Sequence, residues 1–310
     1  MRKGVGGHML PEVVSHSPTS APPHPPHARM PLTIDPLRDA DVADAMALST
    51  GEGWNQTDAD WRRLLRLGIG GCFAARVDGR LVGTVTTTVY ESALAWIGMM
   101  IVHPDARRQG VGAALMTRAL AHLDAAGVAC VKLDATPAGL PLYRRLGFEE
   151  EVLFERWMGI ATPARSASPA RAERSALGPV LPIDLASFGA DRSRLLGMLE
   201  AEASAVHVVR ESEPGVEGYA LARAGRIATY LGPIVSTRRE IAARLFDALL
   251  SHFSGQQVCI DVNSACLLAP ARLVEAGLAP ARPLMRMRRG GSAATGTRAE
   301  LCGSAGPEYG

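Results

Sequence analysis

Apolar and polar positions alternate between residues 32 and 158 in a pattern that predicts successive strands and helices. Short apolar runs bounded by turn residues indicate strands, and apolar residues spaced three or four apart indicate helices. Strands are predicted at 32–38, 72–77, 81–89, 93–102, 128–135 and 152–158, and helices at 39–49, 58–67, 111–126 and 142–146. The Asp78-Gly79 pair is typical of a tight hairpin turn. This order of elements predicts an α/β fold.

A similar order of elements recurs in the second part of the chain. Its predicted elements are a hairpin and long strand at 219–235, a helix at 236–253, a strand at 258–264, a helix at 271–278 and a strand at 283–288. Any α/β chain alternates strands and helices, so chance is a rival explanation. Because order and spacing agree to within a few residues, we interpret the pattern as an internal structural repeat.

Three segments interrupt this pattern. Residues 1–30 are rich in Pro and His and predict a disordered tail, and their irregularly spaced histidines do not predict a metal site. Residues 161–178 contain mainly Ala, Ser, Pro and Arg, which is typical of an interdomain linker. Residues 290–310 are rich in Gly and Ser and predict a flexible tail. Domains are therefore expected at 31–160 and 179–289.

Composition narrows the class of protein. The 310 residues suffice for two domains, and a net charge of +2 argues against a nucleic-acid partner. No apolar run approaches the roughly 18 residues of a membrane helix, so we expect no membrane partner. The 5 cysteines have no close pairing and predict buried free thiols in a reducing cytoplasm.

The loop HPDARRQGVG, residues 103–112, joins a buried strand to a helix. Backbone N–H groups at a helix N-terminus, together with the helix dipole, favour a phosphate. Gly110 and Gly112 allow close backbone approach, and Arg107, Arg108 and Gln109 add donors. The loop therefore predicts an anion site.

The spacing Arg107-x-x-Gly110-x-Gly112 is not that of a P-loop or a dinucleotide-binding turn. It resembles the acyl-CoA pyrophosphate loop of the GNAT N-acetyltransferase superfamily. The run LYRRLGF, residues 142–148, also resembles that family, whose tyrosine falls on Tyr143. The family's common Asn and Ala positions fall on Thr136 and Gly139, which depart from the pattern.

The resemblance covers residues 32–159, and the segments 53–61 and 133–139 look like the tandem-GNAT subgroup. It implies two GNAT-like domains in tandem, each with a mixed, mostly antiparallel central sheet flanked by helices. It implies acetyl-CoA as co-substrate without a metal, and direct transfer in a ternary complex. It assigns cofactor binding to Met100, Ile101, Val102, Arg107, Arg108, Gln109, Gly110, Val111, Gly112, Ala113 and Thr136.

The resemblance makes Tyr143 the general acid that protonates the departing thiolate. The alternative is a half-buried tyrosine that packs on the sheet.

Acceptor binding is expected between the first two helices, at Trp54, Asn55, Gln56 and Asp58. The alternative is a loop with a helix cap at Thr57 or Asp58.

The base that deprotonates the amine is left open among Glu52, Asp134, His103 and a water chain, with Glu52 and Asp134 also expected near the acceptor.

The second half lacks the loop glycines and the tyrosine on which the predicted site of the first half depends. It has no glycine between Val235 and Ser251, its loop is shorter, and Leu273 stands where Tyr143 would be expected. We therefore expect a degenerate second domain that forms a wall of the acceptor site or the surface of a homodimer. The leading hypothesis is N-acetylation of a small amino-acid-like or other primary amine. The alternatives are a protein or peptide N-acetyltransferase and a non-catalytic acyl-CoA sensor.

Overall fold

Strands and helices form where the apolar periodicity predicts them, with boundaries shifted by a few residues. The computed structural model describes residues 1, 31–162, 177–210, 215–291 and 296–310. The predicted tail 1–30 and linker 161–178 lie almost entirely outside these residues. The helix predicted at 58–67 has the expected bounds, because the Thr57 side chain accepts a hydrogen bond from the Asp60 backbone N–H and caps it.

The N-terminal half, residues 31–160, contains every element predicted for it. Its elements are β1 (Leu32–Pro36), α1 (Val42–Gly51), α2 (Asp58–Leu67), β2 (Phe73–Val77), β3 (Arg80–Tyr90), β4 (Leu94–Val102), α3 (Val111–Ala125), β5 (Cys130–Ala135), α4 (Leu140–Arg145) and β6 (Glu149–Ile160). Asp78 and Gly79 both have positive φ, 50° and 75°, as a tight hairpin turn requires.

The C-terminal half, residues 178–290, repeats the order and begins with three elements that the apolar pattern did not predict. Its elements are α5 (Leu181–Phe188), α6 (Ser193–Glu202), β7 (Ala205–Val209), β8 (Gly218–Arg223), β9 (Thr229–Ser236), α7 (Arg239–His252), β10 (Gln257–Asn263), α8 (Pro270–Glu275) and β11 (Leu278–Gly290). Short 3-10 turns lie at Asp39–Asp41, Pro104–Ala106, Gly178–Val180 and Arg298–Glu300.

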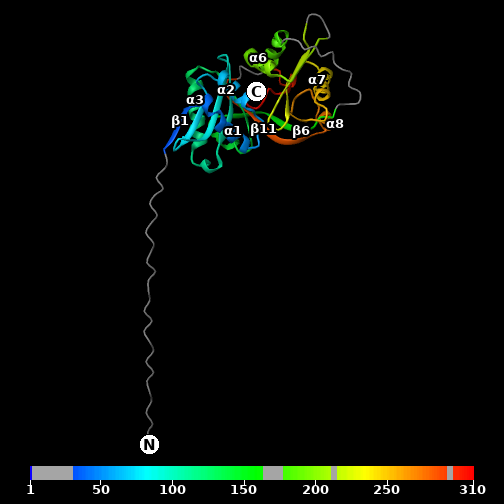
Figure 1. Cartoon of the computed structure of the whole chain (residues 1–310). Coiled ribbons are helices and arrows are strands. Elements are labelled where there is room, and N and C mark those ends of the chain that lie inside the picture. Colours follow the sequence, from blue (N-terminus) through cyan, green and yellow to red (C-terminus); the bar gives the residue numbers. More distant parts are fainter. Residues whose placement is uncertain (2–30, 163–176, 211–214, 292–295) are drawn as a thin grey trace. The chain divides into compact units, whose positions relative to one another are not determined.

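The two halves share one mixed, mostly antiparallel sheet. Its order is β1-β2-β3-β4-β5-β11-β6-β10-β9-β8-β7, and β12 (Leu301–Gly303) pairs with β9. The strand predicted at 152–158, which forms part of β6, does not pair with β5. Strand β11 lies beside β5, and β6 lies between β11 and β10, so each half receives the last strand of the other (Figure 1). An ion pair from Arg286 on β11 to Asp134 on β5 fixes this pairing.

Helices cover both faces of the shared sheet. Helix α3 packs on β2, β3 and β4, and α7 packs on β7, β8 and β9. Helices α1 and α2 join α5 and α6 in one apolar core, to which Trp61, Leu196 and Tyr309 contribute fully buried side chains. Because this core draws on both halves, Pro31–Gly310 forms one compact unit.

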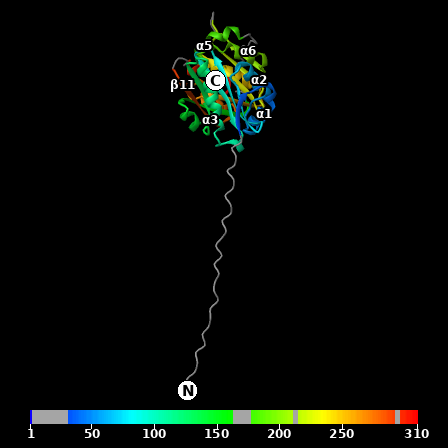
Figure 2. The same cartoon turned by 90° about the vertical axis from the view of Figure 1, so that its left-hand side faces the viewer.

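The closing segment, residues 296–310, is not the flexible tail that its composition predicts. Every residue from Leu301 to Gly310 except Pro307 is buried, and both views mark the end of the chain inside the folded unit (Figure 1, Figure 2). Its small residues permit close packing between the halves, and Leu301 and Tyr309 supply apolar area. Composition indicated flexibility here, whereas close packing and backbone pairing fix the segment.

Candidate active site

Strands β4 and β5 separate and open a wedge in the sheet. Their parallel ladder covers only Leu94–Trp96 and Cys130–Lys132. Beyond it, β4 carries a bulge, where Met99 has a φ of 47° and its carbonyl accepts a 2.7 Å hydrogen bond from Thr84 Oγ1. A bulge bends a strand and ends its pairing. The backbone of residues 100–102 therefore borders the wedge, where the resemblance expects the thioester.

The loop after β4 forms a cradle at the N-terminus of α3. Gly110 is the N-cap residue with a φ of 87°, a left-handed conformation that favours glycine. A Cβ added to Gly112 would lie 3.2 Å from Met100 Cε, so a side chain there would crowd the wedge. The first turn of α3 contains no acidic residue and has no side-chain cap. These features leave its N–H groups available to an anion.

Side chains of the loop brace its shape. Arg107 Nε donates to the Val102 carbonyl at 2.9 Å, and its guanidinium pairs with Glu52. Gln109 Nε2 donates to the Asp105 carbonyl at 2.7 Å. Arg108 has a φ of 60° and no such bond is recorded for it in the described part of the chain. As the loop stands, Arg107 and Gln109 position backbone atoms, and their direct contact with a cofactor stays a prediction.

A cavity of about 60 Å³ lies in the wedge and reaches the C-terminal half. Its lining includes the predicted residues Trp54, Gln56, Met100, Asp134, Thr136 and Tyr143. It also includes Arg282 and Leu284 of β11 and Pro307 and Glu308 of the closing segment. Tyr143 is 7% exposed, and burial raises the pKa of its hydroxyl to about 12. A hydroxyl with that pKa stays protonated at neutral pH, as a general acid must.

The structure separates the expected acceptor residues. Trp54 and Gln56 line the cavity. Asn55 does not, and its part in acceptor binding stays a prediction. Its amide is buried and bonded to the C-terminal half: Oδ1 accepts from the backbone N–H groups of Ile227 and Ala228, and Nδ2 donates to the Ala228 carbonyl at 2.9 Å. Asn55 therefore joins the two halves.

The three side chains considered as bases also have other partners. Asp134 lines the cavity, but both its oxygens accept from Arg286, at 2.8 and 2.9 Å. Glu52 and His103 line a different cavity of about 390 Å³, between α1 and the ends of β3 and β4. There Glu52 pairs with Arg107, and His103 contacts Arg80 at 3.2 Å. Neither borders the cavity at Tyr143.

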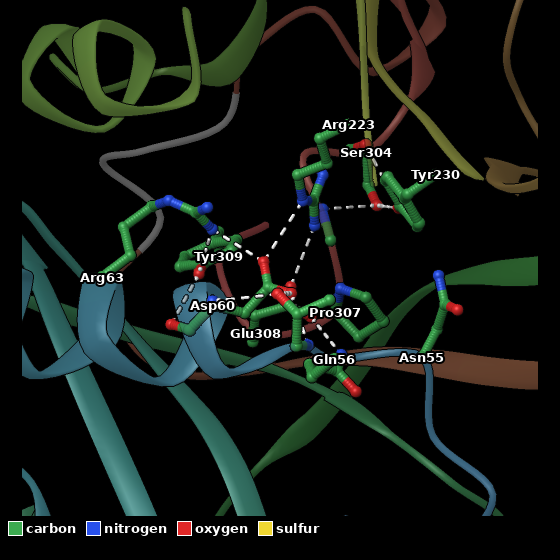
Figure 3. A network of polar contacts seen from close by, with 12 residues as sticks. Asn55, Gln56, Asp60, Arg63, Arg223, Tyr230, Ser304, Pro307, Glu308 and Tyr309 are labelled. Atoms are coloured by element: carbon green, nitrogen blue, oxygen red, sulfur yellow. Dashed lines mark hydrogen bonds and ion pairs between the residues drawn. The ribbon is translucent and has the colours of Figure 1, made fainter. Parts of the chain in front are cut away.

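Glu308 is the acidic residue that sequence reasoning missed. It is 2% exposed, accepts a 2.8 Å hydrogen bond from Gln56 Nε2 and pairs with Arg223 at 3.0 Å. Figure 3 shows it between Gln56 and Asp60 of one half and Arg223 of the other. Burial raises the pKa of its carboxyl and Arg223 opposes that rise. The sequence signal for it was weak, because Glu308 is one of three charged residues in a tail rich in Gly, Ser and Ala.

The closing segment is fixed to the N-terminal half by direct hydrogen bonds. Trp96 Nε1 donates to the Pro307 carbonyl at 2.8 Å, and Tyr90 Oη donates to the Tyr309 carbonyl at 2.8 Å. A Cβ added to Gly98 would lie 2.8 Å from the Glu308 carbonyl oxygen. Glycine at this position of β4 therefore allows the segment to lie directly against the strand.

The corresponding place in the C-terminal half lacks these features. Strand β9 ends at Ser236 and α7 begins at Arg239, so the turn between them is two residues, 237–238. Leu273, at the position of Tyr143, is fully buried. The opening beside β9 is occupied by β12. The prediction of a second half without the cofactor loop and the tyrosine hydroxyl agrees with this geometry.

Comparison with known proteins connects this geometry to acetyltransferases. Models described as "Acetyltransferase (GNAT) domain" match residues 68–150 and 180–303. An uncharacterized N-acetyltransferase, YitH of Bacillus subtilis, is 25% identical over 205 residues, 65% of this chain and 71% of that protein. The holothin acyltransferase of a Pseudoalteromonas species is 26% identical over 242 residues, 77% of this chain and 81% of that protein.

Solved structures share the arrangement over most of the chain. An acetyltransferase-like protein from Pyrococcus horikoshii matches with a TM-score of 0.77 at 20% identity, covering 93% of this chain and 100% of that one. A GCN5-related N-acetyltransferase from Sphaerobacter thermophilus matches with a TM-score of 0.62 at 16% identity, over 84% and 95%. At these identities the likeness establishes the fold. Among the residues that the structure describes, no helix combines the length and apolar character needed to cross a membrane.

Proposed function

Because the chain belongs to the GNAT acetyltransferase family, we propose that it transfers an acetyl group from acetyl-CoA to the primary amine of a small molecule. The choice of acceptor depends on one observation. The cavity beside Tyr143 is about 60 Å³ and is bounded by both halves and by Pro307 and Glu308 of the closing segment. A cavity of that size fits a small head group better than a segment of another protein.

The geometry of the wedge and loop supports acetyl-CoA as the donor. The left-handed Gly110 and the first turn of α3, which has no acidic residue and no side-chain cap, suit the pyrophosphate. The splayed β4 edge at residues 100–102 suits the pantetheine arm and the thioester, because it no longer pairs with β5. Gly112 leaves room beside Met100, where a Cβ would approach within 3.2 Å.

The transfer needs two proton movements that residues of the cavity can perform. The amine nitrogen attacks the thioester carbonyl carbon, so a C–N bond forms and the C–S bond breaks. An acceptor that arrives as an ammonium ion first releases one proton to water and becomes the free amine. We assign the proton that the nitrogen loses on attack to Glu308, and the proton that the departing sulfur receives to Tyr143. Both groups then re-equilibrate with water. A backbone N–H such as that of Val102 would stabilise the charge on the thioester oxygen.

One relative adds support for acyl transfer by this two-part chain. The protein named holothin acyltransferase covers 77% of this chain, so the similarity includes both halves. Its name specifies one acceptor, holothin, and we make no transfer of that acceptor to this chain.

An acceptor panel with CoA release as the readout tests the proposal. The panel contains small primary amines, amino acids and peptides with free N-termini, each with acetyl-CoA. We expect CoA release with small amines and little with peptides longer than a few residues. CoA release with peptides but not with small amines would favour a protein or peptide N-acetyltransferase instead. Binding of acetyl-CoA without release for any acceptor would favour the non-catalytic alternative.

A further inference from the structure

Arg282 places a guanidinium group in the wall of the candidate active-site cavity. It lies on β11 at a bulge between Pro280 and Arg282, and its guanidinium carbon lies 5.7 Å from the centre of the Trp54 ring. Its Nε is buried and has no hydrogen-bond partner in the part of the chain that the structure describes. Burial and the nearby Arg156 lower the pKa of Arg282, whereas the charges of Asp261 and Glu308 act in the opposite direction.

Two buried arginines, Arg156 on β6 and Arg286 on β11 itself, each pair with a carboxylate. Arg156 donates to both oxygens of Asp261, at 2.7 and 2.6 Å. Arg286 donates to both oxygens of Asp134, at 2.8 and 2.9 Å. A guanidinium binds a carboxylate in this two-pronged way because its donors match the spacing of the two oxygens. Arg282 has the same chemistry, but no carboxylate of the described residues pairs with it in this way.

Gln56 provides an unused acceptor in the same cavity. Its residue is 5% exposed, and its Nε2 donates to Glu308 Oε2 at 2.8 Å. Its Oε1 is buried and has no partner among the described residues. An oxygen with an adjacent carboxylate suits an ammonium group, which brings three donors and a positive charge. The cavity therefore offers a cation on one side and two acceptors on another.

We propose that the acceptor is an amino acid, whose carboxylate binds Arg282 and whose ammonium group binds Gln56 Oε1 and Glu308. This inference rests on the proposed acetyl transfer and narrows its substrate class. A carboxylate beside an amine satisfies every unpaired polar atom named above with one small ligand. The volume of about 60 Å³ and the apolar Leu284 and Trp54 in the lining favour a carboxylate over a bulkier phosphate.

The test compares acceptors that differ only at the carboxylate. An amino acid, its amide and its decarboxylated amine are assayed with acetyl-CoA, and kcat/KM is measured from CoA release. We expect the amino acid to be preferred by about tenfold or more over both analogues, because each lacks the charged partner of Arg282. Equal use of all three would overturn the inference and leave the proposed acetyl transfer intact.

Variants separate recognition from folding. Arg282→Gln should raise KM for the amino acid by about tenfold or more, with little change in kcat and little change for the amide. Arg288→Gln is the control, since Arg288 lies on the same strand and pairs with the exposed Glu149. It should leave the preference unchanged. If Arg282→Gln melts well below the wild type, Arg282→Lys replaces it and should keep part of the preference. An Arg282→Gln or Arg282→Lys enzyme that keeps the full preference for the amino acid contradicts the assignment.

A binding measurement distinguishes failure of the inference from failure of the proposed function. Melting temperature is measured with CoA present and with each of the three acceptors added. If no acceptor releases CoA, the proposed function fails. In that case the carboxylate site is still supported if the amino acid raises the melting temperature and the amide and the decarboxylated amine do not. The Arg282→Gln variant should not show this rise. The absence of any rise overturns it.

Discussion

The two halves contain the same wedge in the sheet but fill it differently. In the N-terminal half the β4–β5 ladder ends at Trp96, and the opening leads to the cavity at Tyr143. In the C-terminal half the β9–β10 ladder covers Val258–Cys259, and β12 then pairs with β9. Asn263 Nδ2 also donates to the Leu301 carbonyl at 2.7 Å. The chain itself therefore occupies the place where the other half has room for a ligand.

The turns that follow the two wedges also differ, both in length and in the charge of the helix turn after them. The eight residues 103–110 precede α3, whose first turn has no acidic residue. Only residues 237–238 connect β9 to α7, and the first turn of α7 contains Glu240. A negative charge at a helix N-terminus competes with a bound anion for the same N–H groups and dipole. The core therefore preserves the fold in both halves, whereas the turn and the wedge leave room for a ligand in the N-terminal half.

The largest effect, on kcat, is expected at Tyr143, which is replaced by Leu273 in the C-terminal half. Tyr143→Phe should lower kcat by about 100-fold, because general acids contribute at least that much. Its affinity for acetyl-CoA, measured by titration, should not change, because the hydroxyl acts on the departing sulfur. Leu273→Met is the matched control in the C-terminal half and should leave kcat unchanged. A Tyr143→Phe enzyme with full kcat would remove Tyr143 from the mechanism.

Because the pKa of Tyr143 is raised, the melting temperatures of the wild type and Tyr143→Phe should depend differently on pH. The hydroxyl has a pKa of about 12 in the folded protein against 10.0 as its ordinary value. A raised pKa means that the stabilisation is complete below the unfolded value and is lost as pH rises toward the folded value. Between about pH 9 and about pH 11 the melting temperature of the wild type should therefore fall more than that of Tyr143→Phe. Equal losses would show that Tyr143 ionises in the folded protein as freely as in the unfolded chain.

Glycines at equivalent positions of β4 and β9 test the shared closing segment. A Cβ at Gly98 would lie 2.8 Å from the Glu308 carbonyl oxygen, and one at Gly232 would lie 2.2 Å from that of Ser304. Either alanine should destabilise the fold by about 1–3 kcal/mol, the usual cost of overpacking, as measured by chemical denaturation.

Only Gly98→Ala acts directly on Glu308, so it should also raise KM for the acceptor more than Gly232→Ala does. Equal changes in KM would mean that the segment supports the fold without shaping the acceptor site.

Much of this comparison could be predicted from the sequence, because its determinants are local. The loop glycines, the tyrosine and the repeat all follow from patterns within a few residues. Thr57 and Asp60 specify the start of α2 by a capping pair. Turn chemistry at Asp78-Gly79 specifies the hairpin in the same way.

The rest depended on contacts between residues far apart in the chain. Strands β6 and β11 have similar lengths and apolar patterns, so neither sequence specifies which one pairs with β5. Asp134 read alone suggests a base, and only its pairing with Arg286, 152 residues away, reveals a structural role. Glu308 lies in a tail whose composition is typical of disorder. Its position follows from packing between the halves, which no local pattern encodes.

The smallest effect is expected at the two ends of α3, where glycines have the same backbone conformation but different surroundings. Gly110 and Gly127 have φ values of 87° and 69°, and an added Cβ would meet nothing within 4 Å at either position. Alanine at either should therefore cost about 1 kcal/mol of stability from backbone strain alone. Gly110→Ala should in addition weaken acetyl-CoA binding by about fivefold, because only that end of α3 presents N–H groups to the proposed pyrophosphate site. Isothermal titration of both variants measures the difference, and unchanged affinity in Gly110→Ala would mean that the cofactor's phosphates are held elsewhere.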